Sequence, residues 1–292
     1  MATEDSDPRY SELDTWPDTE ILAALLESQD RAVEAVRQAL PHLAQAAQKA
    51  AGVVLAGGRW AYAGAGTSGR IALQDGVELV PTFGLEADRL VYIVAGGEKA
   101  LTQAVEGAED DPEAGARAVQ DAGLGPQDLL VALAASGKTP FTLAALCSAQ
   151  ERGTFTVAIA NNPGSPLLES ANIGILLATG PEVLAGSTRL SAGTAQKIAL
   201  NLFSTLAMIR SGKTYGNLMV GLKPTNAKLW ARATNLVAQI SGCDPINAAQ
   251  CLERSGGQVA LAVLLARGLD LTTARELLAQ SKGNLRQAIS NL

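Results

Sequence analysis

Two short turns rich in glycine and hydroxyl side chains are the segments of this chain best suited to bind an anion. The first, GAGTSGR at 64–70, lies between a strand-like run and a helix-like run, and the second, AASGKTP at 134–140, follows the apolar run 128–133. Such turns present free backbone N–H groups at a helix N-terminus, where negative charge is favoured. Together they predict a site for one phosphorylated small molecule, with these candidate binding residues: Thr67, Ser68, Ser136, Gly137 and Thr139.

The first turn also fits the dinucleotide-binding pattern G-x-G-x-x-G, which is the main alternative. That pattern expects an acidic residue about 20 residues further on, at the end of the second strand, to hold a ribose. Here the second strand-like run, 90–94, ends in Ala95-Gly96-Gly97, and Asp88 precedes the run instead of closing it. A tight turn without any ligand is a further alternative. The second turn favours phosphate binding over both.

Two segments carry carboxylates that could act as an acid and a base. Glu78 lies near the C-terminal end of the helix after the first turn, which we expect PTFG at 81–84 to stop. The helix dipole disfavours a carboxylate there, and a residue placed against local preference is a hint of function. Glu109 belongs to the acidic cluster EGAEDD at 106–111, in which neighbouring carboxylates can raise one another's pKa. The alternative for both glutamates is a solvated surface carboxylate, which the pattern alone favours.

Ser187 and Thr188 directly precede a long helix predicted at 190–211. Their hydroxyls can cap that helix, contact a ligand, or do both, because the same free N–H groups at the helix start serve either purpose.

The chain has one histidine, His42, and three cysteines. We interpret His42 as structural, because a catalytic triad or a multi-histidine metal site would have to be built around it alone. The cysteines show neither metal-ligand spacing nor a disulfide framework. We therefore expect no metal site, and acid–base chemistry falls to carboxylates, lysines or tyrosines.

The order of predicted elements indicates an α/β protein. A helix capped by Asp18 is expected to run to about residue 51, and helices separate most of the later strand-like segments. Alternating strands and helices with apolar strands predict a doubly wound parallel five-stranded sheet covered on both faces. Ligands bind such sheets beyond the carboxyl ends of the strands, where both hydroxyl-rich turns fall. The predicted strands are 53–63, 89–94, 128–133, 155–160 and 173–177.

The last part of the chain reads as helical. A helix is expected at about 225–241, and from residue 244 onward we expect a small module of three short helices. These patterns predict an N-terminal arm and helix at 1–52, an α/β domain at 53–241 that binds the phosphorylated molecule, and a small helical domain at 242–292.

Composition limits the classes of partner. Of 292 residues, 47% are hydrophobic and only 4% aromatic, so the core must be built from Ala, Val, Leu and Ile. The net charge of -6 and the lack of a basic run argue against nucleic-acid binding. The polar N-terminal segment 1–18 has no signal-peptide pattern, and no apolar stretch is long enough to span a bilayer. We expect a cytoplasmic protein.

Eight motifs in order resemble one family over nearly the whole chain, the N-acetylmuramic acid 6-phosphate etherases of the sugar-isomerase-domain (SIS) phosphosugar-binding superfamily. They are GAGTSGR (64–70), PTFG (81–84), AGG (95–97), AVEGAEDD (104–111), AASGKTP (134–140), GPEVLAGSTRL (180–190), AGTAQK (192–197) and YGNLMV (215–220). The sequence differs from the usual family pattern next to the first glutamate, where Val77, Leu79 and Val80 replace Ser, Cys and Pro, and at Lys138, which replaces Arg.

The resemblance implies a reaction and roles for residues. Such etherases cleave the D-lactyl ether of N-acetylmuramic acid 6-phosphate through its open-chain aldehyde, by elimination and hydration, without a cofactor. By position, Glu78 would protonate the leaving lactate and Glu109 would remove the C2 proton. The resemblance also implies a homodimer. Two alternatives stay open: a non-catalytic phosphosugar-binding regulatory protein, as some relatives are, and a nicotinamide-dependent oxidoreductase.

Overall fold

The computed structural model describes residues 3–292, and the chain divides into two compact units. The first unit comprises the residues up to Gly76 together with Asp88–Ser204, and the second comprises Val77–Ala87 and Thr205–Leu292. The domain boundaries expected from the sequence, 1–52, 53–241 and 242–292, stay a prediction.

The first unit is built on a parallel sheet of five strands, which confirms the predicted fold class. The strands are β1 (Trp60–Gly64), β2 (Leu90–Val94), β3 (Leu129–Leu133), β4 (Phe155–Ala160) and β5 (Ile173–Leu176). Their order is β2-β1-β3-β4-β5, so the direction of strand addition reverses between β1 and β3. Ligands of doubly wound sheets bind beyond the carboxyl ends of the strands at this switch point. The two hydroxyl-rich turns follow β1 and β3.

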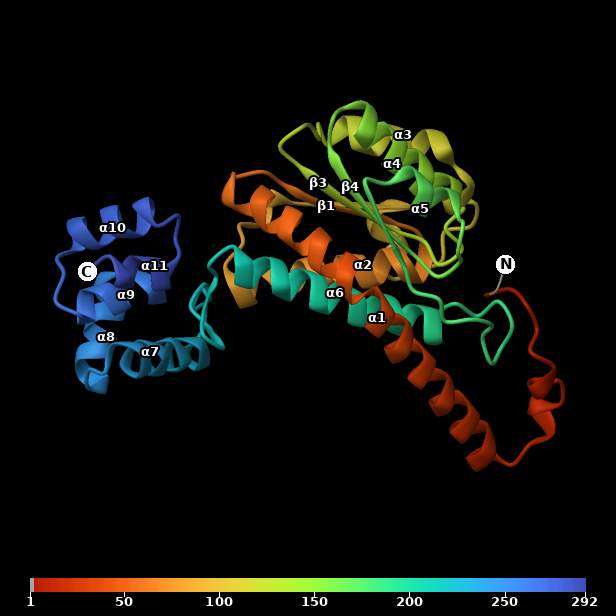
Figure 1. Ribbon diagram of the computed structural model, residues 1–292, viewed down its shortest axis with the longest axis horizontal. Coiled ribbons are helices and arrows are strands. Elements are labelled where there is room, and N and C mark those ends of the chain that lie inside the picture. The colour runs from red at the N-terminus through yellow and green to blue at the C-terminus, as the bar shows by residue number, and fades with distance from the viewer. Residues whose placement is uncertain (1–2) are drawn as a thin grey trace. The chain divides into compact units, whose positions relative to one another are not determined.

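Helices cover both faces of the sheet (Figure 1): α3, α4 and α5 lie on one face, and α1, α2 and α6 on the other. Their bounds are α1 Asp18–Leu55, α2 Gly66–Phe83, α3 Pro112–Asp121, α4 Pro140–Glu151, α5 Pro166–Ser170 and α6 Ser191–Arg210. The final turns of α2 and α6 belong to the second unit. Short 3₁₀ helices are Pro8–Tyr10, Leu13–Thr15, Ala87–Arg89, Gly97–Leu101 and Ala108–Asp110.

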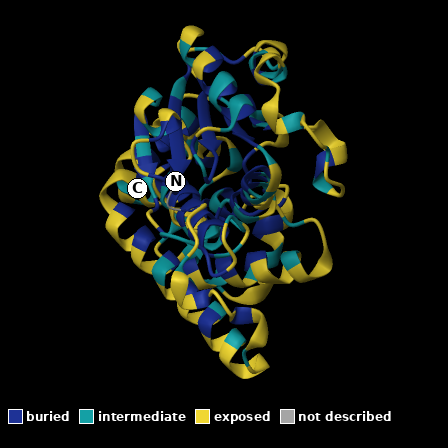
Figure 2. Cartoon of the chain, turned by 90° about the vertical axis from the view of Figure 1, so that its right-hand side faces the viewer, coloured by how far each residue is buried: buried dark blue, intermediate teal, exposed yellow. Residues whose placement is uncertain are grey.

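The sheet is the centre of the core, and its strands are buried almost throughout (Figure 2). On the α3 and α4 face, the core consists of alanines together with Ile, Val and Leu and one Phe, as the low aromatic content predicts. On the other face the rings of Trp60 and Tyr62 stack at 5.9 Å, and Phe203 of α6 meets Trp60 edge-on at 5.0 Å. Three of the chain's few aromatic side chains are therefore concentrated where α6 crosses β1.

Two predicted boundaries differ from the structure. Helix α1 runs four residues past the expected end, to Leu55, so the first strand begins at Trp60 and not at residue 53. Pro17 is the N-cap of α1, while Asp18 is its first helical residue, where a carboxylate is favourable near the helix dipole. Helix α2 contains Pro81 and ends at Phe83, so it stops within the PTFG segment as expected.

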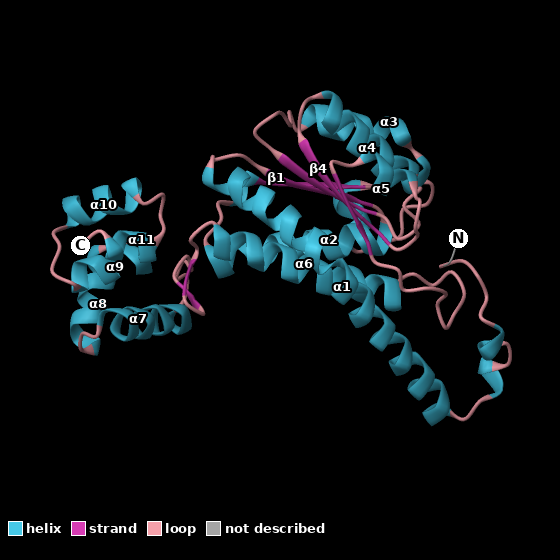
Figure 3. Cartoon of the chain, viewed as in Figure 1, coloured by secondary structure: helices cyan, strands magenta, loops and turns pink. Residues whose placement is uncertain are grey.

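The second unit is helical apart from a short hairpin (Figure 3). It contains β6 (Thr214–Tyr215), β7 (Leu218–Met219), α7 (Ala227–Ser241), α8 (Pro245–Arg254), α9 (Val259–Ala266), α10 (Leu271–Gln280) and α11 (Leu285–Ser290). The helical C-terminal region is thus confirmed, but it is divided into four helices after residue 244, not three. The unrecognised break precedes Asp270, whose side chain accepts hydrogen bonds from the N–H groups of Thr272 and Thr273 and starts α10. Within residues 3–292 no helix has the length and apolarity needed to cross a lipid bilayer.

Candidate functional site

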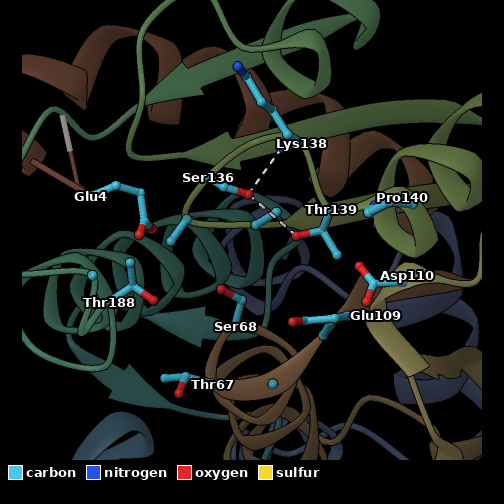
Figure 4. Close-up of a pocket in the computed structure, with 15 residues that line it drawn as sticks. Glu4, Thr67, Ser68, Glu109, Asp110, Ser136, Lys138, Thr139, Pro140 and Thr188 are labelled. Carbon is cyan, nitrogen blue, oxygen red and sulfur yellow. Dashed lines mark hydrogen bonds between the residues drawn. The ribbon is translucent and has the colours of Figure 1, made fainter. Parts of the chain in front are cut away.

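A cavity of about 420 Å³ opens at the switch point of the sheet. The two predicted turns form much of its wall, and Figure 4 shows the hydroxyls of Ser68, Ser136 and Thr139 gathered around one space. Of the predicted site residues, the structure brings these together in its lining: Thr67, Ser68, Glu109, Ser136, Thr139 and Thr188. The site therefore lies where the strand order reverses, as the fold class predicts.

The turn after β1 places Thr67 and Ser68 in the first turn of α2. A Cβ at Gly69 would lie 2.8 Å from the carbonyl oxygen of Gly64, so both glycines are needed for α2 to begin directly against β1. Ser68 is buried, with 8% of its surface exposed. The free N–H groups of a first helical turn and these two hydroxyls all suit an anion.

The turn after β3 is closed by its own hydrogen bonds. The backbone N–H of Lys138 donates to Ser136 Oγ at 3.1 Å, and Ser136 Oγ lies 3.5 Å from Thr139 Oγ1. Gly137 shapes this turn without lining the cavity: its φ is +65°, and its carbonyl accepts a hydrogen bond from the N–H of Leu167. The Lys138 side chain extends away from the other labelled residues (Figure 4).

Capping does not account for the hydroxyls before α6. The buried carboxylate of Glu182 caps this helix, since it accepts hydrogen bonds from the N–H groups of Ser191 and Ala192 and from the Ser191 hydroxyl. Thr188 lines the cavity, whereas Ser187 is not among its lining residues. The Thr188 hydroxyl is therefore placed for a ligand, and the helix start is satisfied without it.

The two candidate glutamates lie in different units. Glu109 is on the 3₁₀ helix Ala108–Asp110 and lines both this cavity and a neighbouring one of about 320 Å³. Glu78 is an exposed residue of α2 within the second unit and is not among the residues that line the cavity. Asp111 has a structural role, because its carboxylate caps α3 through the N–H of Ala114 at 2.9 Å.

Two acidic residues that line the cavity, Glu4 and Asp110, were not predicted from the sequence. Glu4 lines the cavity although it lies far from both turns along the chain, and no local pattern marks it as a site residue. Asp110 also lines the cavity, and its position next to Glu109 in the acidic cluster is the sequence feature that could have identified it as a site residue.

A buried polar network holds α2 against β1 and α6. The Asp75 carboxylate accepts hydrogen bonds from Tyr62 Oη at 2.7 Å, Ser204 Oγ at 3.0 Å and Asn201 Nδ2 at 3.3 Å. Burial raises the pKa of Asp75, and it also raises the pKa of Tyr62. Every member lies in the first unit, so this network sets the rotation of α2 in the turns that follow Thr67 and Ser68.

Metal-ligating residues do not cluster in the described part of the chain. Within residues 3–292 no group of three or more His, Cys, Asp or Glu side chains is arranged to hold a metal ion. His42 is exposed on α1 and does not line the cavity.

Family models and a solved structure define the class of this protein. Residues 33–150 match the glucokinase regulatory protein N-terminal SIS domain, and residues 110–209 match the SIS domain. A phosphoheptose isomerase from Francisella tularensis has the same fold, with a TM-score of 0.50 and 22% identity, covering 67% of this chain and 99% of that one. The sheet with its hydroxyl-lined cavity is therefore that of a SIS-domain protein.

Two relatives narrow the class to a family. A protein from Deinococcus radiodurans is 49% identical over 288 residues, which is 98% of this chain and 94% of the relative. A protein from Mesorhizobium japonicum is 44% identical over 293 residues, which is 100% of this chain and 95% of the relative. Both are named N-acetylmuramic acid 6-phosphate etherase. The chain belongs to the family of N-acetylmuramic acid 6-phosphate etherases.

Proposed function

We propose that this protein is a carbon–oxygen lyase that cleaves the D-lactyl ether of N-acetylmuramic acid 6-phosphate. The products are N-acetylglucosamine 6-phosphate and D-lactate. Membership of the etherase family supports this function, and one observation about the site carries it: Glu109 shares a cavity with the hydroxyls of both turns. A phosphosugar held by the turns has its carbon skeleton within the same space as a carboxylate.

The phosphate is bound by hydroxyls and backbone N–H groups. Thr67 and Ser68 stand at the N-terminus of α2, while Ser136 and Thr139 precede the N-terminus of α4. Two helix N-termini thus direct their positive ends toward one edge of the sheet, which favours a doubly charged phosphate. Thr188 is placed to contact the sugar or the phosphate from a third segment.

The reaction is an elimination followed by a hydration. In the open-chain sugar the C1 aldehyde acidifies the C2 proton, which Glu109 removes as general base. The bond between C3 and the ether oxygen then breaks, and Glu78 as general acid protonates the departing lactate oxygen. Water next adds across the C2–C3 double bond, placing a hydroxyl on C3 and a proton on C2. Two carboxylates in opposite protonation states suffice for these proton transfers.

The protein acts as a homodimer in which Glu78 of one copy completes the cavity of the other. Glu78 follows Ser68 by about three helical turns along α2 and is exposed, with the exposed apolar side chain of Val77 beside it. Helix α1 carries exposed apolar residues at heptad spacing, Leu26, Val33 and Leu40, of which Leu26 is 70% exposed. Apolar residues repeated every seven positions lie along one face of a helix, which is the face that a second helix can cover.

The cellular setting follows from the chemistry of the ligands. Substrate and product both carry a phosphate, and such charged sugars do not cross a bilayer unaided. We therefore place the enzyme in the cytoplasm, in the recycling of cell-wall amino sugars.

Release of D-lactate tests the proposed activity. The purified protein is incubated with N-acetylmuramic acid 6-phosphate, and D-lactate is measured with a coupled dehydrogenase. Glu109→Gln and Glu78→Gln are each expected to lower kcat by roughly 10²- to 10⁴-fold, the range for loss of general acid–base catalysis. Glu113→Gln is the matched control, because Glu113 is an exposed carboxylate on α3 close to the same cluster. Wild-type turnover in both variants contradicts the assignment, and phosphosugar binding without lactate release favours a regulatory protein.

Mixing the two inactive variants tests the shared site. A dimer of Glu78→Gln with Glu109→Gln has one site with both carboxylates intact and one with neither. Random exchange makes about half of the dimers mixed, so about a quarter of wild-type activity is expected to return. If no activity returns although affinity capture of one tagged variant retains the untagged other, each copy supplies both glutamates to its own site.

A further inference from the structure

The N-terminal arm is anchored to the site through Thr3. Thr3 is fully buried, at 0% exposure, and its N–H donates to Asn162 Oδ1 at 3.3 Å. Asn162 Nδ2 donates in return to Thr3 Oγ1 at 2.8 Å and to the carbonyl oxygen of Ala135 at 2.9 Å. On its other side, the carbonyl oxygen of Thr3 accepts a hydrogen bond from the N–H of Gly186. Thr3 therefore connects the turn after β3 with the segment that carries Thr188.

Because Thr3 is held in this way, the next residue, Glu4, lies at the cavity. Glu4 is among the lining residues, and Figure 4 shows its carboxylate directed inward on the side of Thr188, opposite Glu109 and Asp110. A Cβ at position 186 would lie 3.0 Å from Glu4 Oε2, so glycine at this position leaves room for the carboxylate.

A carboxylate in a phosphate-binding cavity restricts how the ligand lies. An ionised carboxylate only accepts hydrogen bonds, and it repels a nearby phosphate. Phosphate is therefore favoured at the turns, next to Ser136 and Ser68, and disfavoured beside Glu4. The part of the ligand that meets Glu4 has to be a hydrogen-bond donor, either a sugar hydroxyl or an amide N–H.

We infer that Glu4 is a specificity-determining residue whose carboxylate accepts a hydrogen bond from a hydroxyl or the acetamido N–H of the bound phosphosugar. This inference rests on the proposed function of the same cavity. Thr3 is the positioning residue for Glu4. The arm thus selects a sugar that offers a hydrogen-bond donor to Glu4 while its phosphate lies at the two turns.

Two ligands separate this role from a merely structural one. N-acetylglucosamine 6-phosphate and inorganic phosphate are titrated by calorimetry into the wild-type protein, Glu4→Gln and Glu4→Ala. Loss of a hydrogen bond to a charged acceptor is expected to weaken binding of the phosphosugar by roughly 10- to 100-fold. Binding of inorganic phosphate stays equal or tightens, because a negative charge is removed. Glu12→Gln is the matched control, since Glu12 is an exposed carboxylate of the same arm.

The positioning role is tested at Thr3. Thr3→Val removes the hydroxyl that Asn162 engages and is expected to weaken phosphosugar binding, while the conservative variant Thr3→Ser restores it. Thermal denaturation of each variant checks that the chain is folded.

Unchanged phosphosugar affinity in both Glu4 variants overturns the inference. Equal weakening of both ligands also overturns it, because that result indicates displacement of the arm and not loss of a sugar contact. D-lactate release by the wild-type protein is measured in parallel. If the wild type binds the phosphosugar through Glu4 but releases no lactate, the proposed function fails and the role of Glu4 stands. If lactate is released and both Glu4 variants bind the phosphosugar as the wild type does, only the role of Glu4 fails.

Discussion

Replacing Gly137 with alanine is expected to destabilise the turn that carries Ser136 and Thr139. The φ of Gly137 is +65°, a left-handed conformation that costs other residues about 1–2 kcal/mol. The added Cβ would also lie 2.2 Å from Ser165 Oγ and 2.4 Å from Ser165 Cβ, closer than real Cβ contacts. Overpacking of this kind costs about 1–3 kcal/mol. Gly137→Ala should therefore lower the free energy of unfolding by about 2–5 kcal/mol.

A second glycine separates the cost of the contact with Ser165 from the cost of the left-handed backbone. Gly123 has a φ of +60° and nothing within 4 Å of an added Cβ, so Gly123→Ala should cost only about 1–2 kcal/mol. Ser165 offers the complementary test, because its Oγ makes no hydrogen bond within the described residues. Ser165→Gly alone should change the free energy of unfolding little. Combined with Gly137→Ala, it should restore most of the stability that Gly137→Ala loses beyond the loss in Gly123→Ala.

The assay is urea denaturation followed by tryptophan fluorescence, together with calorimetric titration of N-acetylglucosamine 6-phosphate. Gly137→Ala is expected to weaken phosphosugar binding as well, since Ser136 and Thr139 move with the turn. Equal stability losses for Gly137→Ala and Gly123→Ala, or no recovery with Ser165→Gly, would refute the argument that the close approach to Ser165 fixes this turn.

Two buried carboxylates should give pH dependences of opposite sign. Burial opposes the charge of Asp128, but hydrogen bonds from Arg59 and the N–H of Gly125 outweigh it and lower the pKa of Asp128. Its stabilisation is therefore present above the unfolded pKa and is lost as pH falls, so Asp128→Asn should cost about 1–3 kcal/mol at neutral pH and less in acid. Burial raises the pKa of Asp75, so the wild type should lose stability as pH rises from the unfolded to the folded value, and Asp75→Asn should remove that dependence. Urea denaturation at a series of pH values measures the free energy of unfolding of the wild type and of each variant. If that free energy changes with pH equally in the wild type and in a variant, the pKa shift assigned to the replaced residue is wrong.

Much of the fold and part of the site could be predicted from local patterns. Each core strand is a short apolar run, and the runs that end at residues 94, 133 and 160 match the ends of β2, β3 and β4. The glycines and hydroxyls of the two turns are also local signals, because a strand that passes at once into a helix needs small residues. The predictions failed where one local pattern suits both a helix and a strand. The apolar residues at the start of 53–59 fit a strand, but they form the end of α1.

Local sequence patterns specify the alternation of apolar strands and helices, and with it the strand ends that carry Thr67, Ser68, Ser136 and Thr139. These features depend on residues within a few positions of one another. Three other features depend on tertiary packing: the capping of α6 by Glu182, the presence of Glu109 but not Glu78 in the cavity lining, and the position of Glu4 in that lining. Glu182 reaches Ser191 and Ala192 nine and ten positions further on, and the contact of Thr3 with Asn162 joins positions 159 residues apart. Such contacts form only when the sheet has brought its loops together, because packing and not local conformational preference selects them.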